Sequence, residues 1–177
     1  MNLLLITGMP GAGKSIVAEF FKQEGYPVIC MGDIIREEVR KKGLEYTPET
    51  GKKTMLELRE KYGNNAVAIK CIEKIKKMDD ETIIVEGVRS LDEVNEFKKI
   101  ANIKIIGIHA SPETRFKRLS TRKRGDDPDN YDIFQERDLR ELKIGLGNVI
   151  ALSDIMIINE YSLDDLKQNC IKIKEIL

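Results

Sequence analysis

The segment that most constrains the fold is a glycine-rich loop near the N-terminus, Gly8-Met9-Pro10-Gly11-Ala12-Gly13-Lys14-Ser15. It fits the pattern GxxxxGK(S/T), follows the apolar run 3–7 and precedes a stretch of helical period. The glycines let the backbone bend tightly and direct its N–H groups toward an anion, and the positive end of the following helix adds to that attraction. In this setting the motif predicts that the loop holds the phosphates of a nucleoside triphosphate. Lys14 would reach the β- and γ-phosphates, and the Ser15 hydroxyl would ligate Mg²⁺.

Beyond this loop the chain alternates short β-branched runs with longer amphipathic stretches. The apolar runs are 3–7, 27–30, 82–86, 103–109 and 154–159. Each is short and almost continuously apolar, which is typical of parallel strands buried on both faces. Segments of helical period lie between and after them, at 14–24, 33–42, roughly 48–77, 91–99, 112–122, 131–146 and 163–176. The alternation predicts an α/β fold in one domain over residues 1–177, with a five-stranded parallel sheet and helices on both faces.

The composition narrows the possible classes of protein. Of the 177 residues 41% are hydrophobic and 34% are charged, which excludes a disordered chain and a chain that lies mostly in a membrane. Thirty Lys and Arg balance thirty Asp and Glu, so no net charge favours a nucleic-acid partner or an anionic membrane. Cys30, Cys71 and Cys170 are not spaced for a disulfide framework or for zinc, and the N-terminal apolar run is too short for a signal peptide or a membrane span. We therefore expect a cytoplasmic protein, and nothing in the sequence specifies its oligomeric state.

A carboxylate is expected beside the phosphate loop at the end of the run 82–86. Three apolar residues there are followed by Glu86, at the point where a buried strand would end. Open parallel sheets place their ligands at the carboxyl ends of the strands, and Mg²⁺ prefers oxygen ligands. We expect Glu86 and Ser15 to serve the metal. The alternative is an acid that simply ends a strand.

The arginines indicate a second substrate that carries phosphate. The chain lacks the Asn-Lys-x-Asp tetrapeptide with which small GTPases read guanine. Arg115, Arg118 and Arg122 are three and four residues apart, so a helix would place them on one face. Residues 115–124 carry six basic side chains and no acid, and residues 125–130 are acidic and rich in turn formers. We expect a short helical lid over the phosphates, roughly at 115–140, and a solvated charged hairpin is the alternative.

Four motifs together resemble the nucleoside monophosphate kinases among the P-loop kinases, adenylate kinase in particular. The loop is similar to their GxPGxGKx loop, and Gly32-Asp33-Ile34-Ile35-Arg36 matches their GDxxR segment. Glu86-Gly87-Val88-Arg89 resembles their DGxPR segment, and Arg118-Leu119-Ser120-Thr121-Arg122 resembles their RLxxR segment. The resemblance covers essentially the whole chain. It is closer still to an archaeal adenylate-kinase-related family of unassigned function, which also resembles dephospho-CoA kinase.

This resemblance implies a P-loop kinase fold and an ATP-dependent phosphotransferase that acts with Mg²⁺ on a nucleoside monophosphate, AMP being the favoured acceptor. ATP would be bound by Gly8, Met9, Pro10, Gly11, Ala12, Gly13, Lys14, Ser15, Arg118 and Arg122. The acceptor would be bound by Asp33, Arg36 and Arg89, in a helical part at roughly 33–77. The catalytic residues would be Lys14, Arg89, Arg122 and Arg137, and Arg140 would also point at the transferring phosphoryl group.

The match is incomplete around the acceptor. Arg89 stands one residue earlier than the arginine of the DGxPR segment, and residues 47–55 show no pattern specific for adenine. Two alternatives stay open. A dephospho-CoA kinase would phosphorylate a hydroxyl and need a general base, for which Asp33 is the only obvious candidate. A regulatory module would bind ATP, hydrolyse it slowly and act through a partner.

Overall fold

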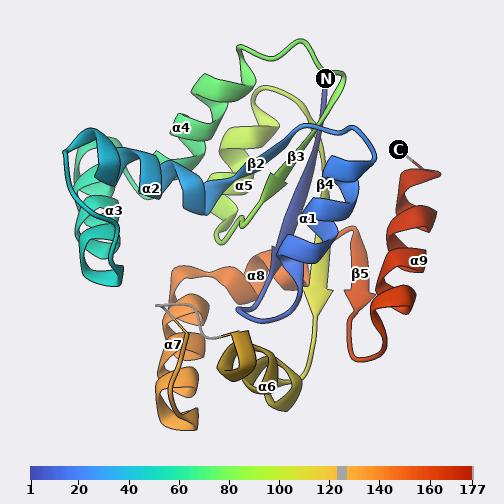
Figure 1. Ribbon diagram of the computed structural model, residues 1–177. Helices are drawn as coiled ribbons and strands as arrows, with labels where there is room; N and C mark the ends of the chain where they lie inside the picture. The colour runs from blue at the N-terminus through green and yellow to red at the C-terminus, as the bar shows by residue number, and fades with distance from the viewer. Residues whose placement is uncertain (123–126, 177) are drawn as a thin grey trace.

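The sheet has its first strand at the centre. The computed structural model describes residues 1–122 and 127–176 (Figure 1). β1 (Asn2–Gly8) pairs in parallel with β3 (Thr82–Glu86) on one side and with β4 (Asn102–His109) on the other. β2 (Val28–Cys30) and β5 (Ile155–Ile158) form the two edges, which gives the order β2-β3-β1-β4-β5. The predicted parallel sheet of five strands is confirmed.

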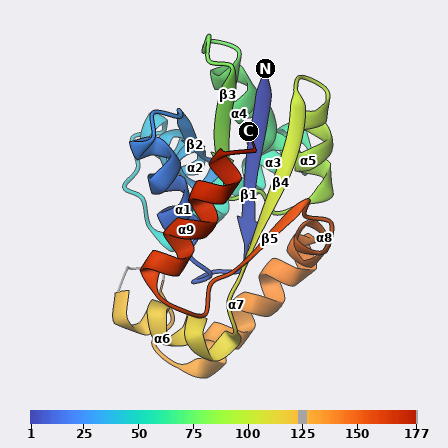
Figure 2. The ribbon, with the colours of Figure 1, turned by 90° about the vertical axis from the view of Figure 1, so that its right-hand side faces the viewer.

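The two faces of the sheet hold separate parts of the core. Leu3 and Leu5 of β1 pack on one face, and Leu4 and Ile6 pack on the other, because successive strand residues point in opposite directions. All four are at most 1% exposed, which explains why the strand reads as a continuous apolar run. The first face is covered by α4 (Ala66–Ile75), α5 (Leu91–Lys98) and α8 (Leu146–Ala151). The second is covered by α1 (Lys14–Gln23) and α9 (Leu163–Lys174), which lie in front of the sheet in Figure 2.

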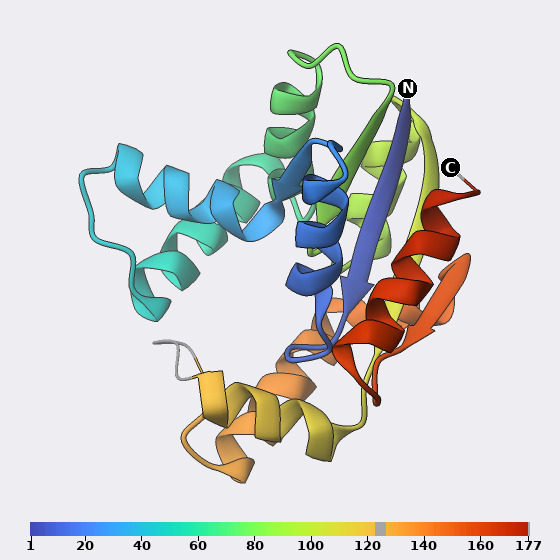
Figure 3. The same cartoon turned by 45° about the vertical axis from the view of Figure 1, so that its right-hand side comes forward.

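Two further pairs of helices extend away from the sheet (Figures 1 and 3). α2 (Met31–Lys41) and α3 (Pro48–Tyr62) form one, and α6 (Pro112–Arg122) and α7 (Tyr131–Ile144) form the other. They are called here the acceptor arm and the lid arm, after the roles that the sequence leads us to expect. Asn130 caps the start of α7, since its Oδ1 accepts a hydrogen bond of 3.0 Å from the Ile133 N–H. The predicted lid at 115–140 falls on the lid arm, and its residues 123–126 lie outside the described part of the chain.

Two of the predicted helical segments were too long. The segment at 48–77 is divided into α3 and α4, because Gly63 ends α3 with a φ of 89°. The segment at 131–146 ends at Ile144, because Gly145 adopts the left-handed conformation and caps both α7 and α8. The short helix α8 was not predicted, and the remaining helices agree with prediction to within two residues at each end.

The order of the strands opens a crevice beside β1. From β1 the chain passes to β2 on one side of the sheet, whereas from β3 it crosses to β4 on the other side. The connections therefore leave the carboxyl ends of β1 and β3 in opposite directions, and ligands of open parallel sheets bind at such a switch point. The glycine-rich loop follows β1 and Glu86 ends β3, so the strand order places both at this crevice.

Among the described residues, no helix is both long enough and apolar enough to cross a membrane. The three cysteines are free thiols.

Candidate functional site

The glycines of the phosphate loop meet two independent requirements. Gly11 and Gly13 have φ angles of 82° and 106°, a conformation that residues with a Cβ rarely adopt. A Cβ on Gly11 would lie 2.9 Å from the carbonyl oxygen of Arg115, and a Cβ on Gly13 would lie 2.3 Å from Nδ2 of Asn159. The loop is therefore pressed against α6 and against the end of β5. Its shape depends on these contacts as well as on its own sequence.

Asn159 supports the loop from behind, and sequence reasoning did not identify it. It follows β5, is only 5% exposed, and donates from Nδ2 to the carbonyl oxygen of Ala12 at 2.8 Å. Its own carbonyl oxygen accepts from the Arg118 guanidinium at 2.9 Å. One buried asparagine thus connects the phosphate loop to the lid arm.

Arg115 has a different place from the one its spacing suggests. The side chain is 3% exposed and donates to the carbonyl oxygen of Pro10 at 3.1 Å and to both carboxylate oxygens of Asp138 on α7. It also lies over the ring of Phe134, with its guanidinium carbon 4.9 Å from the ring centroid. The expectation that Arg115 faces phosphates together with Arg118 and Arg122 is therefore wrong. Arg115 joins α6, α7 and the phosphate loop as a buried structural cation.

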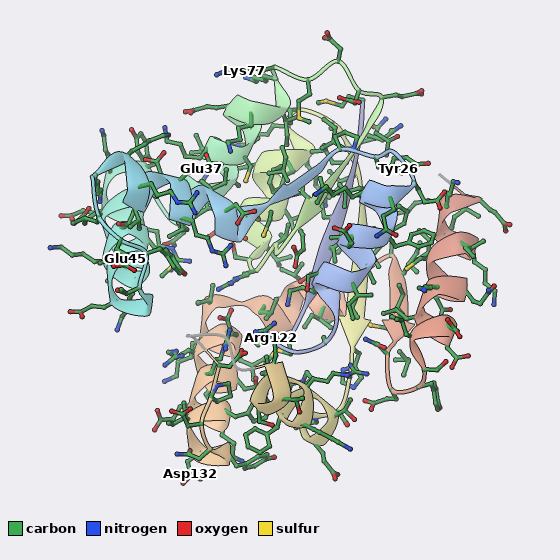
Figure 4. The ribbon with its side chains drawn as sticks, viewed as in Figure 1. Tyr26, Glu37, Glu45, Lys77, Arg122 and Asp132 are labelled. Carbon is green, nitrogen blue, oxygen red and sulfur yellow. The ribbon has the colours of Figure 1, made fainter. Side chains whose placement is uncertain are left out.

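Most of the other predicted residues gather around one cleft of about 480 Å³ at the switch point. The phosphate loop lines it with Pro10, Gly11, Gly13, Lys14 and Ser15. Glu86 and five arginines complete the wall, and these arginines are Arg36, Arg89, Arg118, Arg122 and Arg137. Figure 4 shows Arg122 beside the phosphate loop, at the end of α6.

Several predicted residues do not line this cleft. Gly8, Met9 and Ala12 belong to the loop but face elsewhere, and Ala12 is fully buried in the core. Asp33 is exposed and forms an ion pair of 2.5 Å with Arg36 of the same helix. Arg140 is exposed and does not line the cleft, whereas Arg137 does. The structure thus brings together the basic residues of the prediction and leaves Asp33 and Arg140 outside.

Lys14 is held in place before any phosphate binds. Its Nζ donates to the carbonyl oxygens of Gly8 and Met9 at 2.8 and 3.2 Å. Burial, and secondarily the nearby Arg89 guanidinium, lower the pKa of Lys14 from 10.5 to about 8. A group with this pKa becomes more strongly cationic when an anion arrives, which suits it to hold phosphate.

Besides Arg36, three of the cleft arginines lie beside carboxylates, and these are Arg89, Arg122 and Arg137. Arg122 is paired with the nearly buried Asp127, and Arg137 lies 3.8 Å from the same carboxylate. Arg89 donates from Nη1 to Oε1 of Glu141 on α7 at 3.0 Å. Glu141 was not predicted, because no motif in the sequence marks it. A bound phosphate would therefore enter a set of cations whose charge is already partly balanced.

A second, smaller cavity of about 170 Å³ adjoins the cleft and shares Gly32, Gly87 and Arg89 with it. Its other walls come from the acceptor arm, α4 and α5, and are mixed: Met31, Ile35, Met55 and Val67 are apolar, whereas Tyr46, Lys52, Arg59 and Glu93 are polar. Nε of Arg59 is buried without a hydrogen-bond partner in the described structure. The cavity therefore offers apolar surface together with an unused donor.

Glu93 holds the main chain of Arg89 at the boundary between the two cavities. Its Oε2 accepts from the Arg89 N–H at 2.7 Å, and burial raises the pKa of this carboxyl. The Ser90 side chain caps α5 by accepting from the Glu93 N–H. In a standard capping box the Glu93 carboxylate would accept from the N–H of the cap residue Ser90, but here it accepts from the N–H of the residue before it, Arg89. This small departure fixes the backbone at the arginine that both cavities share.

The cleft also contains oxygen ligands of the kind that Mg²⁺ prefers. The Ser15 hydroxyl and the Glu86 carboxylate both line it next to Lys14. No group of three or more His, Cys, Asp or Glu among the described residues could enclose a metal ion. Mg²⁺ in phosphate sites usually takes one or two protein oxygens and completes its shell with water and phosphate, so this donor set fits.

Comparison with known proteins shows the family. A family described as an AAA domain matches residues 7–135. A UPF0200 protein of Methanocaldococcus jannaschii is 50% identical over 167 residues, which cover 93% of this chain and 85% of that protein. A UPF0200 protein of Pyrococcus furiosus is 48% identical over 176 residues, which cover 97% of this chain and 95% of that protein. The chain belongs to both families. The name UPF0200 states no activity, so the reaction has to be argued from the site.

Solved structures share the fold at low sequence identity. TT1252 from Thermus thermophilus has a TM-score of 0.70 at 18% identity, over 99% of this chain and 97% of that one. A shikimate kinase from Acinetobacter baumannii has a TM-score of 0.62 at 16% identity, over 99% of this chain and 93% of that one. A second shikimate kinase, from Bacteroides thetaiotaomicron, has a TM-score of 0.67 at 13% identity, over 98% and 97% of the two chains. The predicted P-loop kinase fold is confirmed.

Proposed function

We propose that the chain is a cytoplasmic phosphotransferase that moves the γ-phosphoryl group of Mg²⁺-bound ATP to a nucleoside monophosphate, with AMP as the favoured acceptor. One observation carries the proposal: two cavities meet at Arg89. A protein that only hydrolyses ATP needs the cleft at the phosphate loop. The second cavity, of about 170 Å³, begins where that cleft ends and has no use in such a protein.

On the ATP side, the residues supply position and charge. The loop N–H groups and the start of α1 would hold the β- and γ-phosphates. Lys14 would exchange its hydrogen bonds to the Gly8 and Met9 carbonyl oxygens for contacts with these phosphates. Arg118, Arg122 and Arg137 face the same space from the lid arm and would stabilise charge on the transferring group. Ser15 and Glu86 would hold the Mg²⁺ ion, which neutralises phosphate charge when bound.

On the acceptor side, Arg36 and Arg89 would hold the acceptor phosphate in line with the γ-phosphorus. A phosphate oxygen is already a competent nucleophile, so this reaction needs positioning and no dedicated base. The remainder of the acceptor would lie in the second cavity, whose apolar residues suit the faces of a flat ring and whose Arg59 suits its polar edge. The choice of AMP rests on the resemblance to adenylate kinase.

The two alternatives are less well supported. A hydroxyl acceptor such as dephospho-CoA requires a base, and Asp33 is exposed, is paired with Arg36 and does not line the cleft. A slow ATPase that acts through a partner leaves the second cavity and the buried, unpaired Nε of Arg59 unexplained.

Transfer from Mg·ATP to a panel of acceptors tests the proposal directly. The panel contains AMP, CMP, UMP, GMP, dephospho-CoA and shikimate, with a control that lacks acceptor. Rapid transfer to a monophosphate is expected. Transfer only to dephospho-CoA or shikimate would replace the acceptor class, and slow hydrolysis alone would favour the regulatory module.

A matched pair of variants on α2 tests the role of Arg36. Arg36→Ala should raise the KM for the acceptor about 10- to 100-fold and leave the KM for Mg·ATP nearly unchanged, since a charge-assisted contact to phosphate is lost. Arg40→Ala removes an exposed arginine one turn further along and should change neither value. If Arg36→Ala raises only the KM for Mg·ATP, the assignment of Arg36 to the acceptor phosphate is contradicted.

A further inference from the structure

Glu141 stands out among the charged residues that contact the cleft arginines, because no motif explains it. Its side chain is 12% exposed, and Oε1 accepts from Arg89 Nη1 at 3.0 Å. Its other oxygen, Oε2, is buried and has no hydrogen-bond partner in the described structure. A buried carboxylate oxygen without a donor reduces stability, so the position calls for a reason other than packing.

We propose that Glu141 is a positioning residue that orients Arg89 toward the acceptor phosphate and couples it to the lid arm. This inference rests on the proposed function, because it assigns Arg89 to the acceptor. Arg89 is fixed at both ends: Glu93 holds its backbone N–H and Glu141 holds one Nη of its guanidinium. An arginine that is held in this way loses less side-chain freedom when a phosphate binds.

The geometry leaves Arg89 able to bind phosphate while it is paired. The guanidinium has five N–H donors, and the contact with Glu141 uses one of them. The side chain remains 45% exposed and lines both cavities. Glu141 therefore directs the free edge of the guanidinium into the cleft and does not cover it.

The same residue connects the two sides of the reaction. Arg137 precedes Glu141 by four residues on α7, so both side chains lie on one face of the helix. Arg137 lines the cleft on the ATP side, whereas Glu141 reaches Arg89 on the acceptor side. Glu141 also acts on Lys14, whose pKa it raises against the lowering by burial and by Arg89. The position of Arg137 is thus tied to that of Arg89 through one turn of α7.

The test is a double-mutant cycle with a binding readout. Glu141→Gln keeps the shape of the side chain and removes its charge. Inorganic phosphate is titrated calorimetrically into the wild type, Glu141→Gln, Arg89→Ala and the double variant, each saturated with Mg·ADP so that the phosphate loop is filled. Glu136→Gln, an exposed position on the same helix, serves as the control.

We expect Glu141→Gln to weaken the Arg89-dependent binding of phosphate about tenfold, as when a charge-assisted contact becomes a neutral one. In the Arg89→Ala background the same change should have no further effect. With the acceptor found in the panel, the KM of that acceptor should rise by a similar factor and the KM for Mg·ATP should stay within about twofold.

Other results would overturn the inference. Unchanged or tighter phosphate binding in Glu141→Gln would mean that Glu141 blocks Arg89 or is irrelevant to it. An equal loss with and without Arg89 would mean that Glu141 acts through the fold, and absence of Arg89-dependent binding in the wild type would remove the site altogether. If Glu141→Gln fails to fold, Glu141→Asp replaces it in the cycle. This variant keeps the negative charge but moves it away from Arg89, so phosphate binding should weaken by less than the tenfold expected for Glu141→Gln. Failure of the acceptor panel would reject the proposed function alone, because the phosphate titration does not depend on transfer.

Discussion

Replacing Lys14 with methionine should abolish transfer and at the same time stabilise the empty protein. The structure holds this lysine in a site that lowers its pKa from 10.5 to about 8. At about 1.4 kcal/mol per pKa unit, keeping Lys14 protonated at neutral pH costs the folded state about 3 kcal/mol. Because Lys14 lines an open cleft, water screens part of this cost. The lost hydrogen bonds to Gly8 and Met9 offset roughly 1 kcal/mol more, so the net gain should be about 1–2 kcal/mol.

Thermal unfolding without nucleotide measures this gain. For a chain of this size about 1 kcal/mol corresponds to roughly 2–4 °C, so Lys14→Met should unfold about 2–8 °C above the wild type at pH 7. Between the folded pKa of about 8 and the unfolded value of 10.5, the unfolded wild type binds more protons than the folded one. The stability of the wild type therefore rises with pH in that window, and the advantage of the variant should disappear near pH 10.

A control and a kinetic measurement complete the experiment. Lys22→Met removes a lysine near the exposed end of the same helix and should not raise the melting temperature at any pH. Transfer by Lys14→Met should fall by orders of magnitude. The reasoning is refuted if Lys14→Met melts at or below the wild-type temperature at pH 7, or if the difference between the two is the same at pH 7 and pH 10.

Three further predictions concern the same loop. Above pH 8 the value of kcat/KM for Mg·ATP should fall about tenfold per pH unit, because Lys14 loses its proton in the nucleotide-free protein. The value of kcat should persist to higher pH, since bound phosphate raises the pKa of Lys14. A flat profile of kcat/KM from pH 7 to 9.5 would contradict this. Gly11→Ala should weaken Mg·ATP binding more than tenfold in a calorimetric titration, because its Cβ would lie 2.9 Å from the carbonyl oxygen of Arg115. Gly25 has a similar φ but nothing within 4 Å of such a Cβ, so Gly25→Ala should leave binding unchanged and reduce stability in a thermal melt by only about 1 kcal/mol. Asn159→Ala leaves the buried carbonyl of Ala12 without its donor, so it should reduce the free energy of unfolding by about 1–3 kcal/mol and raise the KM for Mg·ATP. Denaturant titration and steady-state kinetics measure the two effects, and no change in either would show that the contact is unimportant.

The sequence was sufficient for features that depend on neighbouring residues. The apolar runs gave all five strands because β1 and its neighbours are buried on both faces. The segment at 48–77 was predicted without a break although Gly63-Asn64-Asn65 is a recognisable turn signal, because helical periodicity resumes directly after it. Lys14 and Glu86 were found because each is attached to a strand end that the pattern itself defines.

Contacts between distant parts of the chain could not be predicted in the same way. Asn159 reaches a carbonyl 147 residues away, and Glu141 pairs with an arginine 52 residues away. Arg115 shares a helix face with Arg118, yet the way α6 docks against the phosphate loop buries the first and exposes part of the second to the cleft. Such partners follow from the packing of whole elements, and a single sequence carries no local mark of that packing.

The two arms are attached to the rest of the molecule in different ways. Arg115 locks the lid arm to the phosphate loop through buried contacts, whereas the acceptor arm rests on α4 and β2. Mutations on the acceptor arm can therefore accumulate without disturbing triphosphate binding, while mutations around Arg115 are transmitted to it at once. The fold thus separates a half that can change independently from a half whose changes reach the phosphate loop. One scaffold is accordingly shared by this chain and by two shikimate kinases that are 16% and 13% identical to it.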